Sequence, residues 1–203
     1  NKVFNSYNSS TDFYQIQKKE KLRFFCLSAD HIHKNLTMIP NVVEKLLQHK
    51  ISHNFEFILT LPAKSKTLKK IKKELTIKNH EKYVKNVGQL SLQNCLVWYK
   101  KSDFVFMPTL LEVFSATYLE AMKLEKLIIT SDLEFSREIC HNSAVFFKPN
   151  NPKDAALKII SIISNPELYN ELILNGRKQL NSFPSSDEKH KKILDWMNVI
   201  NER

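Results

Sequence analysis

Glycine is almost missing from this chain. Only Gly88 and Gly176 occur among its 203 residues. The glycine-rich loops that cradle phosphates, in the dinucleotide fingerprint and in the P-loop, need at least two closely spaced glycines. Both kinds of loop are therefore excluded, and a phosphate site in this chain has to use lysines and the N-terminus of a helix.

Cysteines and long apolar runs are scarce too. Cys26, Cys95 and Cys140 are odd in number and far apart, with no C-x-x-C pair, so neither a zinc knuckle nor a redox pair is indicated. We interpret them as small buried thiols in a reducing cytosol. No apolar run approaches the ~18 residues of a transmembrane helix, and nothing after Asn1 resembles a signal peptide. We therefore expect a cytoplasmic protein.

Lysine dominates the charge. Lys and Arg number 31 against 21 Asp and Glu, a net charge of +10, and only four of the basic residues are arginine. The densest stretch runs from Lys64 to Lys85, where Leu68, Ile71 and Leu75 predict a helix with one packed face. Its lysines fit either a solvated helix face or attraction to an anionic membrane surface. Nucleic acid is not expected as a partner, because the interleaved aromatic side chains that such binding usually needs are missing.

The chain divides into three parts. Residues 1–21 are polar and patternless and are interpreted as a linker or N-terminal arm, residues 22–183 as one domain, and residues 184–203 as a C-terminal helix. Within the domain, apolar segments alternate with helical patterns. Strands are predicted over 22–27, 55–59, 83–87, 104–107, 127–129 and 145–147, and the main helices over 35–49, 67–75, 90–100, 114–123, 152–164 and 166–180. Because most of these strands are continuously apolar, we expect an α/β fold with a doubly wound, mostly parallel sheet.

In such folds the ligand lies outside the carboxyl ends of the strands. Glu112 follows the predicted strand 104–107, and Glu120 comes eight residues later, roughly 12 Å further along a helix. Between them, the N–H groups of residues 114–116 are expected to open that helix and face an anion. An anion flanked by two carboxylates that bind hydroxyls fits a nucleotide sugar.

These segments resemble a known family. Asp103 to Glu112, followed by Glu120-Ala121-Met122, is similar to the E-x7-E signature of the group 1 glycosyltransferases, family 4 of the retaining enzymes with the GT-B fold. Further blocks match in the same order: Phe24–Leu27 with His33–Leu36, Asn86–Gly88 with Leu90–Tyr99, and Ile128–Ser131 with Glu134–Cys140 followed by Ala144–Pro149. The resemblance covers about residues 22–183.

The resemblance implies half of an enzyme. Family members have two Rossmann-like domains with the active site between them, and this chain resembles the C-terminal one, which binds the nucleotide-sugar donor. The N-terminal domain, which binds the acceptor, would then be a partner within the same, longer protein, and we expect this part to be inactive without it. The C-terminal helix either reaches back to that domain or packs on this one.

The resemblance also implies residue roles. Glu112 and Lys34 would be the catalytic residues: Glu112 would contact hydroxyls of the transferred sugar, and Lys34 would neutralise the diphosphate. Glu120 would hydrogen-bond the ribose. The donor-binding set is completed by Phe114, Ser115, Ala116 and Gly88, the last near the base. No metal or other cofactor is expected. The plainer alternatives are a helix-surface acid for Glu120, a solvated lysine for Lys34, and loop histidines at His31 and His33 rather than a metal pair.

The chain departs from the family pattern in three segments. After the Glu120 helix, Lys123–Leu127 replaces the usual A-x-G-x-P. Ala29 stands where many members have an arginine, and Val113 and Ser115 stand where glycines are usual. We expect the donor-binding domain of a retaining glycosyltransferase that uses a UDP- or GDP-sugar and a saccharide or lipid-linked acceptor. The alternatives are a non-catalytic nucleotide-binding domain and a basic module for anionic surfaces, including the membrane.

Overall fold

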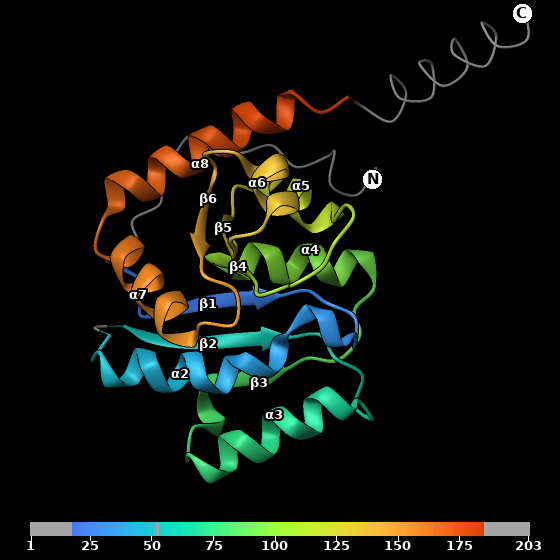
Figure 1. The fold of residues 1–203 in the computed structure, drawn as a ribbon, viewed down its shortest axis with the longest axis vertical. Helices are drawn as coiled ribbons and strands as arrows, with labels where there is room; N and C mark the ends of the chain where they lie inside the picture. The colour runs from blue at the N-terminus through green and yellow to red at the C-terminus, as the bar shows by residue number, and fades with distance from the viewer. Residues whose placement is uncertain (1–17, 52, 185–203) are drawn as a thin grey trace, which may run out of the picture.

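The computed structural model describes residues 18–51 and 53–184, which form a six-stranded sheet with helices on both faces (Figure 1). The strands are β1 (Lys21–Cys26), β2 (Asn54–Leu59), β3 (Val84–Asn86), β4 (Phe104–Met107), β5 (Leu127–Ser131) and β6 (Ala144–Phe147). Their order is β3-β2-β1-β4-β5-β6, and every pairing is parallel. The chain builds outward from β1 to β3 and then returns to β4 beside β1. This confirms the predicted doubly wound, Rossmann-like fold.

The central strands are covered on both sides. Every residue of β4 and β5 is buried, as continuously apolar parallel strands require. The register places Phe24 of β1 beside Phe57 of β2 and Phe104 of β4, and its ring stacks on both with centroids 4.8 Å apart. These stacked rings add directional contacts to the burial that aligns the three strands.

Helices cover the two faces in separate groups. One apolar cluster packs α2 (Ile39–Gln48), α3 (Lys66–Ile77), α7 (Pro152–Ile163) and the first half of α8 (Pro166–Asn181) on one face of the sheet. A second, smaller cluster packs α4 (Leu92–Lys101), α5 (Ala116–Lys123) and α6 (Glu134–Cys140) on the other face. Short 3-10 helices lie in the connections: η2 (Ile32–Lys34), η3 (Leu36–Met38) and η4 (Glu81–Tyr83).

Three helix starts differ from the predictions by two residues or more. The helix expected from residue 35 begins at Ile39, because Asn35 adopts a left-handed backbone (φ 53°) between two 3-10 turns. The helix expected from residue 90 begins at Leu92, where the Ser91 hydroxyl accepts a hydrogen bond from the Asn94 N–H at 3.3 Å. The helix expected from residue 114 begins at Ala116.

Two of the predicted segments, the N-terminal arm and the C-terminal helix, lie at the ends of the chain. The helix predicted within 184–203 lies outside the described residues, as do residues 1–17 of the predicted arm. β1 begins at Lys21, one residue earlier than expected. Among the described helices, none is both long and apolar enough to cross a membrane.

Candidate active site

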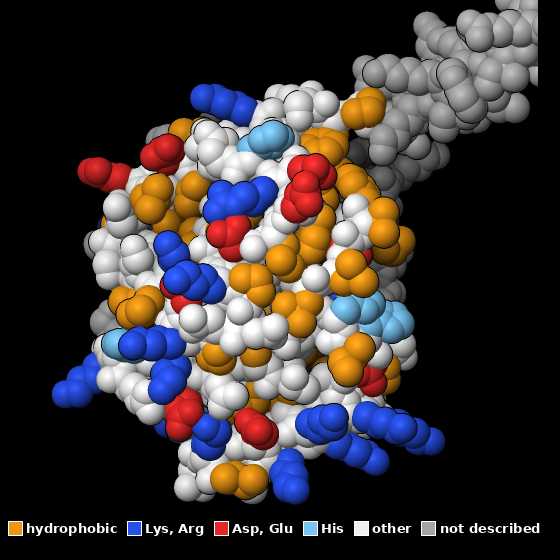
Figure 2. All heavy atoms as spheres, viewed as in Figure 1, with side chains coloured by type: hydrophobic (Ala, Val, Ile, Leu, Met, Phe, Trp, Pro, Cys, Tyr) orange, Lys and Arg blue, Asp and Glu red, His pale blue; other side chains and the backbone are white. Residues whose placement is uncertain are grey.

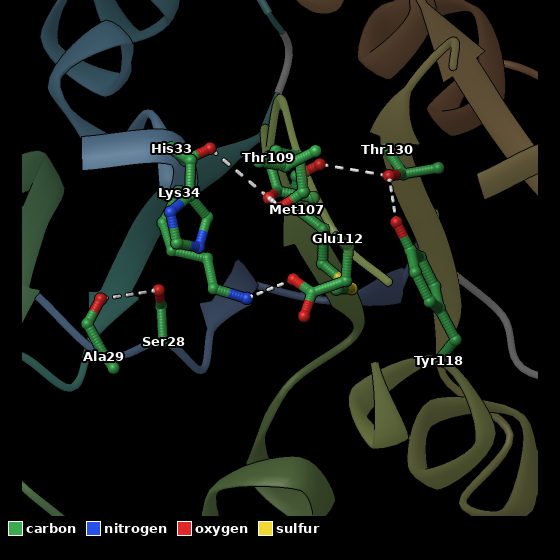
Figure 3. Close-up of polar contacts among 10 residues, drawn as sticks. Ser28, Ala29, His33, Lys34, Met107, Thr109, Glu112, Tyr118 and Thr130 are labelled. Atoms are coloured by element: carbon green, nitrogen blue, oxygen red, sulfur yellow. Dashed lines mark hydrogen bonds and ion pairs between the residues drawn. The ribbon is translucent and has the colours of Figure 1, made fainter. Parts of the chain in front are cut away.

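The candidate site lies at the carboxyl edge of the sheet, between β1 and β4. The order of the strands reverses there, because β2 lies on one side of β1 and β4 on the other. The loops after these two strands consequently diverge, and a ligand can reach the edge between them. Figure 3 shows the two loops and the polar contacts that join them.

The loop after β1 carries Lys34. Its first residues are tied to the end of β2, where the Ser28 N–H donates to the Thr60 hydroxyl at 3.0 Å and that hydroxyl donates to the Ser28 carbonyl at 3.1 Å. The chain then turns through η2, which ends at Lys34. Further along, the Asn35 amide donates to the Asn150 side chain after β6 at 3.0 Å. The lysine therefore sits on a loop that is anchored on both sides.

The loop after β4 carries Glu112 and is held directly against the Lys34 loop. The His33 carbonyl accepts hydrogen bonds from the Leu110 N–H at 2.7 Å and from the Thr109 hydroxyl at 3.3 Å (Figure 3). Next to this junction, the Lys34 ammonium and the Glu112 carboxylate form an ion pair. Each of these side chains is 17% exposed, so the pair is shielded but still reachable from solvent. The structure thus brings the two predicted catalytic residues into contact.

The start of α5 corrects one expectation. Ser115 is the N-cap residue, and its backbone is extended rather than helical. The free N–H groups of the helix therefore belong to Ala116 and Thr117, because the Tyr118 N–H donates to the Ser115 carbonyl at 3.2 Å, whereas Phe114 lies outside the helix. The Phe114 ring is 45% exposed and contacts Phe183 edge-on, with centroids 6.3 Å apart. Of the three predicted residues, only Ala116 offers an N–H that belongs to the helix.

Glu120 is embedded more deeply than a helix-surface acid. Its carboxylate accepts a hydrogen bond from the Tyr99 hydroxyl at 3.0 Å, and Tyr99 is completely buried under α5. Burial raises the pKa of Glu120, and the hydrogen bond from Tyr99 partly opposes this shift. Burial also raises the pKa of Tyr99, so the phenol stays a proton donor to the carboxylate. The matching family block includes Tyr99, but its contact with Glu120 was not predicted.

A second tyrosine joins α5 to the end of β4. The Tyr118 hydroxyl and the Thr130 hydroxyl are hydrogen-bonded at 2.8 Å, and Thr130 also donates to the Met107 carbonyl at 3.0 Å (Figure 3). Met107 is the last residue of β4, directly before the loop that bears Glu112. Sequence reasoning missed this relay, because nothing in the spacing of Tyr118 and Thr130 shows that they meet.

Gly88 lies further along the edge. It follows β3, and β2 separates that strand from β1. Its φ of +77° is in the left-handed region, which favours glycine, while a Cβ at this position would meet no atom within 4 Å. The glycine is thus required by the turn rather than by close packing, and space remains above it.

The histidines of the Lys34 loop pair with each other. The rings of His31 and His33 stack with centroids 5.3 Å apart. Among the described residues, no group of three or more His, Cys, Asp and Glu side chains could hold a metal ion. Independence from a metal stays a prediction.

Comparison with known proteins decides the family. The sequence profile described as "Glycosyl transferases group 1" matches residues 9–179, which is most of the chain. The chain belongs to the group 1 glycosyltransferases. The family predicted from the E-x7-E pattern at Glu112 and Glu120 is thereby confirmed.

Two curated relatives agree with this family. The chain is 26% identical over 166 residues to the O-antigen chain mannosyltransferase RfbU of Salmonella typhimurium, a match that covers 81% of this chain and 44% of that protein. It is 27% identical over 127 residues to the glycosyltransferase MJ1178 of Methanocaldococcus jannaschii, covering 62% of this chain and 36% of that one. The chain therefore spans less than half the length of the curated relatives that it matches.

Solved structures show the same fold. A glycosyltransferase from Rickettsia africae aligns with 100% of this chain and 55% of its own, with a TM-score of 0.78 at 16% identity. An α,α-trehalose-phosphate synthase (UDP-forming) from Burkholderia vietnamiensis aligns with 90% of this chain and 45% of its own, with a TM-score of 0.76 at 10% identity. At such low identities the likeness concerns the fold alone.

Proposed function

We propose that this group 1 glycosyltransferase chain is the donor-binding half of a retaining enzyme that transfers a sugar from a UDP- or GDP-sugar to a saccharide or lipid-linked acceptor. The observation that carries the proposal is the ion pair between Lys34 and Glu112 at the point where the strand order reverses. A cation and a carboxylate on adjoining loops match the two halves of a sugar diphosphate, because the ammonium attracts phosphate and the carboxylate accepts hydrogen bonds from sugar hydroxyls.

Donor binding would break the ion pair between Lys34 and Glu112 and give each side chain a new partner on the donor. The diphosphate takes over the Lys34 ammonium, and the Glu112 carboxylate is released to the hydroxyls of the sugar. During transfer, the bond between the anomeric carbon and the diphosphate oxygen breaks, the oxygen of an acceptor hydroxyl forms a new bond to that carbon, and the hydroxyl proton passes to the departing diphosphate. Negative charge then grows on the leaving nucleoside diphosphate, where the Lys34 ammonium and the free N–H groups at the start of α5 stabilise it.

Glu120 would bind the ribose of the donor. Its carboxylate is held by Tyr99 at 3.0 Å, so its orientation is established before a ligand arrives. A group that is already oriented loses less conformational entropy on binding. Gly88, with open space around its Cα, lies further along the same edge in the direction expected for the base.

Ala29 leaves Lys34 as the main cation of the loop after β1. The ion pair of Lys34 is with Glu112, and no ion pair joins Lys34 to the neighbouring Asp30 within the described residues. The Thr67 and Ser65 side chains hold the pKa of Asp30 below its ordinary value, so Asp30 remains a carboxylate. We therefore expect donor affinity to depend heavily on Lys34.

The acceptor-binding domain would face the carboxyl edge of this sheet. Large apolar side chains stand exposed around the Lys34–Glu112 pair, with Ile32 at 93%, Val113 at 96% and Leu111 at 65% exposure. Exposed apolar side chains concentrated at one site indicate contact with a partner. The matched segments also cover less than half of the curated relatives, so a further domain of the same protein is the expected occupant.

The test is a titration with nucleotides. UDP, GDP, ADP and their common sugars are added to the chain and binding is followed by calorimetry or NMR. We expect saturable binding of one nucleotide class, strongly reduced in Glu112→Ala for the nucleotide sugar and in Lys34→Ala for both ligands. Glu138→Ala and Lys178→Ala, two exposed residues on α6 and α8, serve as matched controls and should bind like the unmodified chain.

A charge swap distinguishes a direct role of the ion pair in donor binding from its contribution to stability. Lys34→Glu combined with Glu112→Lys retains an ion pair between the loops, but places the carboxylate on the loop after β1 and the ammonium on the loop after β4. We expect the swap to regain the stability lost in the single variants and to leave donor binding abolished. If the longer protein with its acceptor domain binds no nucleotide at millimolar concentration, the alternative of a non-catalytic domain replaces the proposal.

A further inference from the structure

The outer face of α3 concentrates the positive charge of the molecule. Between Lys64 and Lys85 the sequence has nine lysines and two glutamates, a net charge of +7 within a chain of +10. α3 lies at the outer edge of the fold next to β3, and Lys and Arg side chains gather over it in the lower part of Figure 2. This surface is remote from the core of the sheet and is not part of the donor site.

The lysines of α3 are arranged in a stripe. Leu68, Ile71 and Leu75 are buried and define the inner face of the helix. The face opposite them carries Lys66, Lys70, Lys73 and Ile77, in steps of four, three and four residues that keep them in line. Lys69 and Lys72 flank this line on one side and are exposed as well. We call these six residues the α3 stripe.

The lysines of the stripe have no acidic partner within the described part of the chain. Among the ion pairs of residues 18–51 and 53–184, none uses a lysine of the stripe. Lys78, just after the helix, does pair with Glu44 at 2.6 Å, so the nearest acid on α2 is already engaged. Glu74 is the single acidic residue within α3. Like charges held this close repel one another, and an external anionic surface would relieve that repulsion.

The stripe ends in an apolar residue and a hollow. Ile77 is 70% exposed at the C-terminal end of α3. Beside it lies a pocket of about 430 Å³, lined by Thr37, Lys70, Lys73, Glu74 and Ile77. Lysines that surround a shallow hollow, next to an exposed aliphatic side chain, match the boundary of a lipid layer, where phosphates lie above acyl chains.

A nucleic acid fits this surface less well. The stripe holds lysines only, whereas planar contacts to bases and phosphates favour arginine. α3 has no aromatic side chain on which a base could stack. A lipid headgroup layer needs neither feature, because it attracts lysines through its diffuse negative charge.

We propose that the α3 stripe docks the protein on an anionic lipid surface, with the lysines at the phosphates and Ile77 at the top of the acyl chains. α3 follows β2 at the carboxyl edge and packs against η3, which comes directly after the Lys34 loop. Docking through α3 would therefore bring the edge that carries the donor site close to the lipid surface.

The test is co-sedimentation with vesicles. The chain is mixed with vesicles of phosphatidylcholine containing phosphatidylglycerol, and in parallel with vesicles of pure phosphatidylcholine. We expect binding to the anionic vesicles alone, and its loss as salt is raised. Removing one lysine near such a surface weakens binding about fivefold, so Lys70→Gln combined with Lys73→Gln should weaken it on the order of 20-fold. Ile77→Ser should have a smaller effect, and Glu74→Gln should strengthen binding.

The matched control removes the same charge elsewhere. Lys153→Gln combined with Lys178→Gln, at exposed positions of α7 and α8, should change binding much less than the α3 pair. Equal losses in the two double variants, or no binding to anionic vesicles at low salt, would overturn the proposal. Tighter binding to an oligonucleotide than to the vesicles at equal salt would overturn it in favour of a nucleic acid. Nucleotide titration of the same variants keeps this result independent of the donor site, which the α3 substitutions leave intact.

Discussion

The side chains that pack on the two faces of the sheet differ in chemistry. The face under α2, α3 and α7 is an apolar core crossed by phenylalanine rings, in which Phe57 stacks on Phe24 and meets Phe106 edge-on. The face under α4, α5 and α6 is smaller, and its two buried tyrosines, Tyr99 and Tyr118, turn their hydroxyls to Glu120 and Thr130. The first face is mostly hydrocarbon, and its buried tyrosine, Tyr169, donates to the Asp103 carbonyl directly before β4, at the edge away from the site. The second face includes hydrogen bonds that end near the site.

The difference separates stability from positioning. Burial of apolar area is non-directional, so the first face contributes stability without orienting a particular group. Hydrogen bonds have preferred directions, so the second face orients Glu120 and the end of β4. The residues of this second face should therefore influence donor binding even where they do not touch the donor.

The largest expected effect comes from two neighbouring phenylalanines that point to opposite faces. Phe24→Ala and Phe25→Ala should each lower the free energy of unfolding by about 3–5 kcal/mol, because both rings are completely buried. Only Phe25→Ala should also weaken nucleotide binding, since its ring packs edge-on against Tyr99 at 5.0 Å. Chemical denaturation measures the stability, and nucleotide titration at a temperature where both variants are folded measures the affinity. Equal losses of affinity would contradict the division between the faces.

A smaller effect is expected from the hydrogen bonds that join Tyr118, Thr130 and the Met107 carbonyl at the end of β4. Tyr118→Phe removes the hydroxyl that bonds to Thr130 at 2.8 Å and should cost about 1 kcal/mol of stability. A double-mutant cycle with Thr130→Val, measured by urea denaturation, isolates this bond from other effects of the two changes. A coupling energy near zero would show that the bond does not stabilise the protein.

The smallest effect should depend on pH. Burial raises the pKa of Glu120 above its ordinary value of 4.5, so the folded protein holds this proton more tightly than the unfolded chain does. The resulting stability is present below pH 4.5 and is lost as the pH rises through the folded pKa. Glu120→Gln should therefore be as stable as the unmodified chain in acid, more stable at neutral pH, and weaker in donor binding.

A denaturation series across pH measures this difference. Tyr99→Phe is the counterpart, because it removes the hydrogen bond that lowers the pKa of Glu120. Its stability should fall more steeply than that of the unmodified chain as the pH rises. A constant gap between Glu120→Gln and the unmodified chain at every pH would show that the carboxylate is not destabilised by burial.

Much of the fold could be predicted from the sequence. Apolar segments such as 104–107 have the length of strands and no polar residues, which requires burial on both faces and hence a parallel sheet. Helix starts were less accurate, because the left-handed turn at Asn35 and the extended backbone of Ser115 depend on neighbouring loops. The predicted ends near residues 1–17 and 185–203 lie outside the described part of the chain.

The candidate site was predictable in its residues but less so in its contacts. Glu112 and Glu120 could be found because their spacing along the chain forms a pattern. The hydrogen bonds from Thr109 to the His33 carbonyl and from Tyr99 to Glu120 could not, since 76 and 21 residues separate the partners. Such distant pairs leave no local periodicity.

The sequence by itself therefore determined the fold class, the family and the two acids, because these depend on local composition and spacing. The tertiary structure alone decided that Lys34 meets Glu112, that Tyr99 supports Glu120, and that, among residues 18–51 and 53–184, no acid forms an ion pair with the α3 stripe. The physical reason is that ion pairing, burial and hydrogen bonding act across space, and only the folded sheet brings the ends of β1 and β4 together.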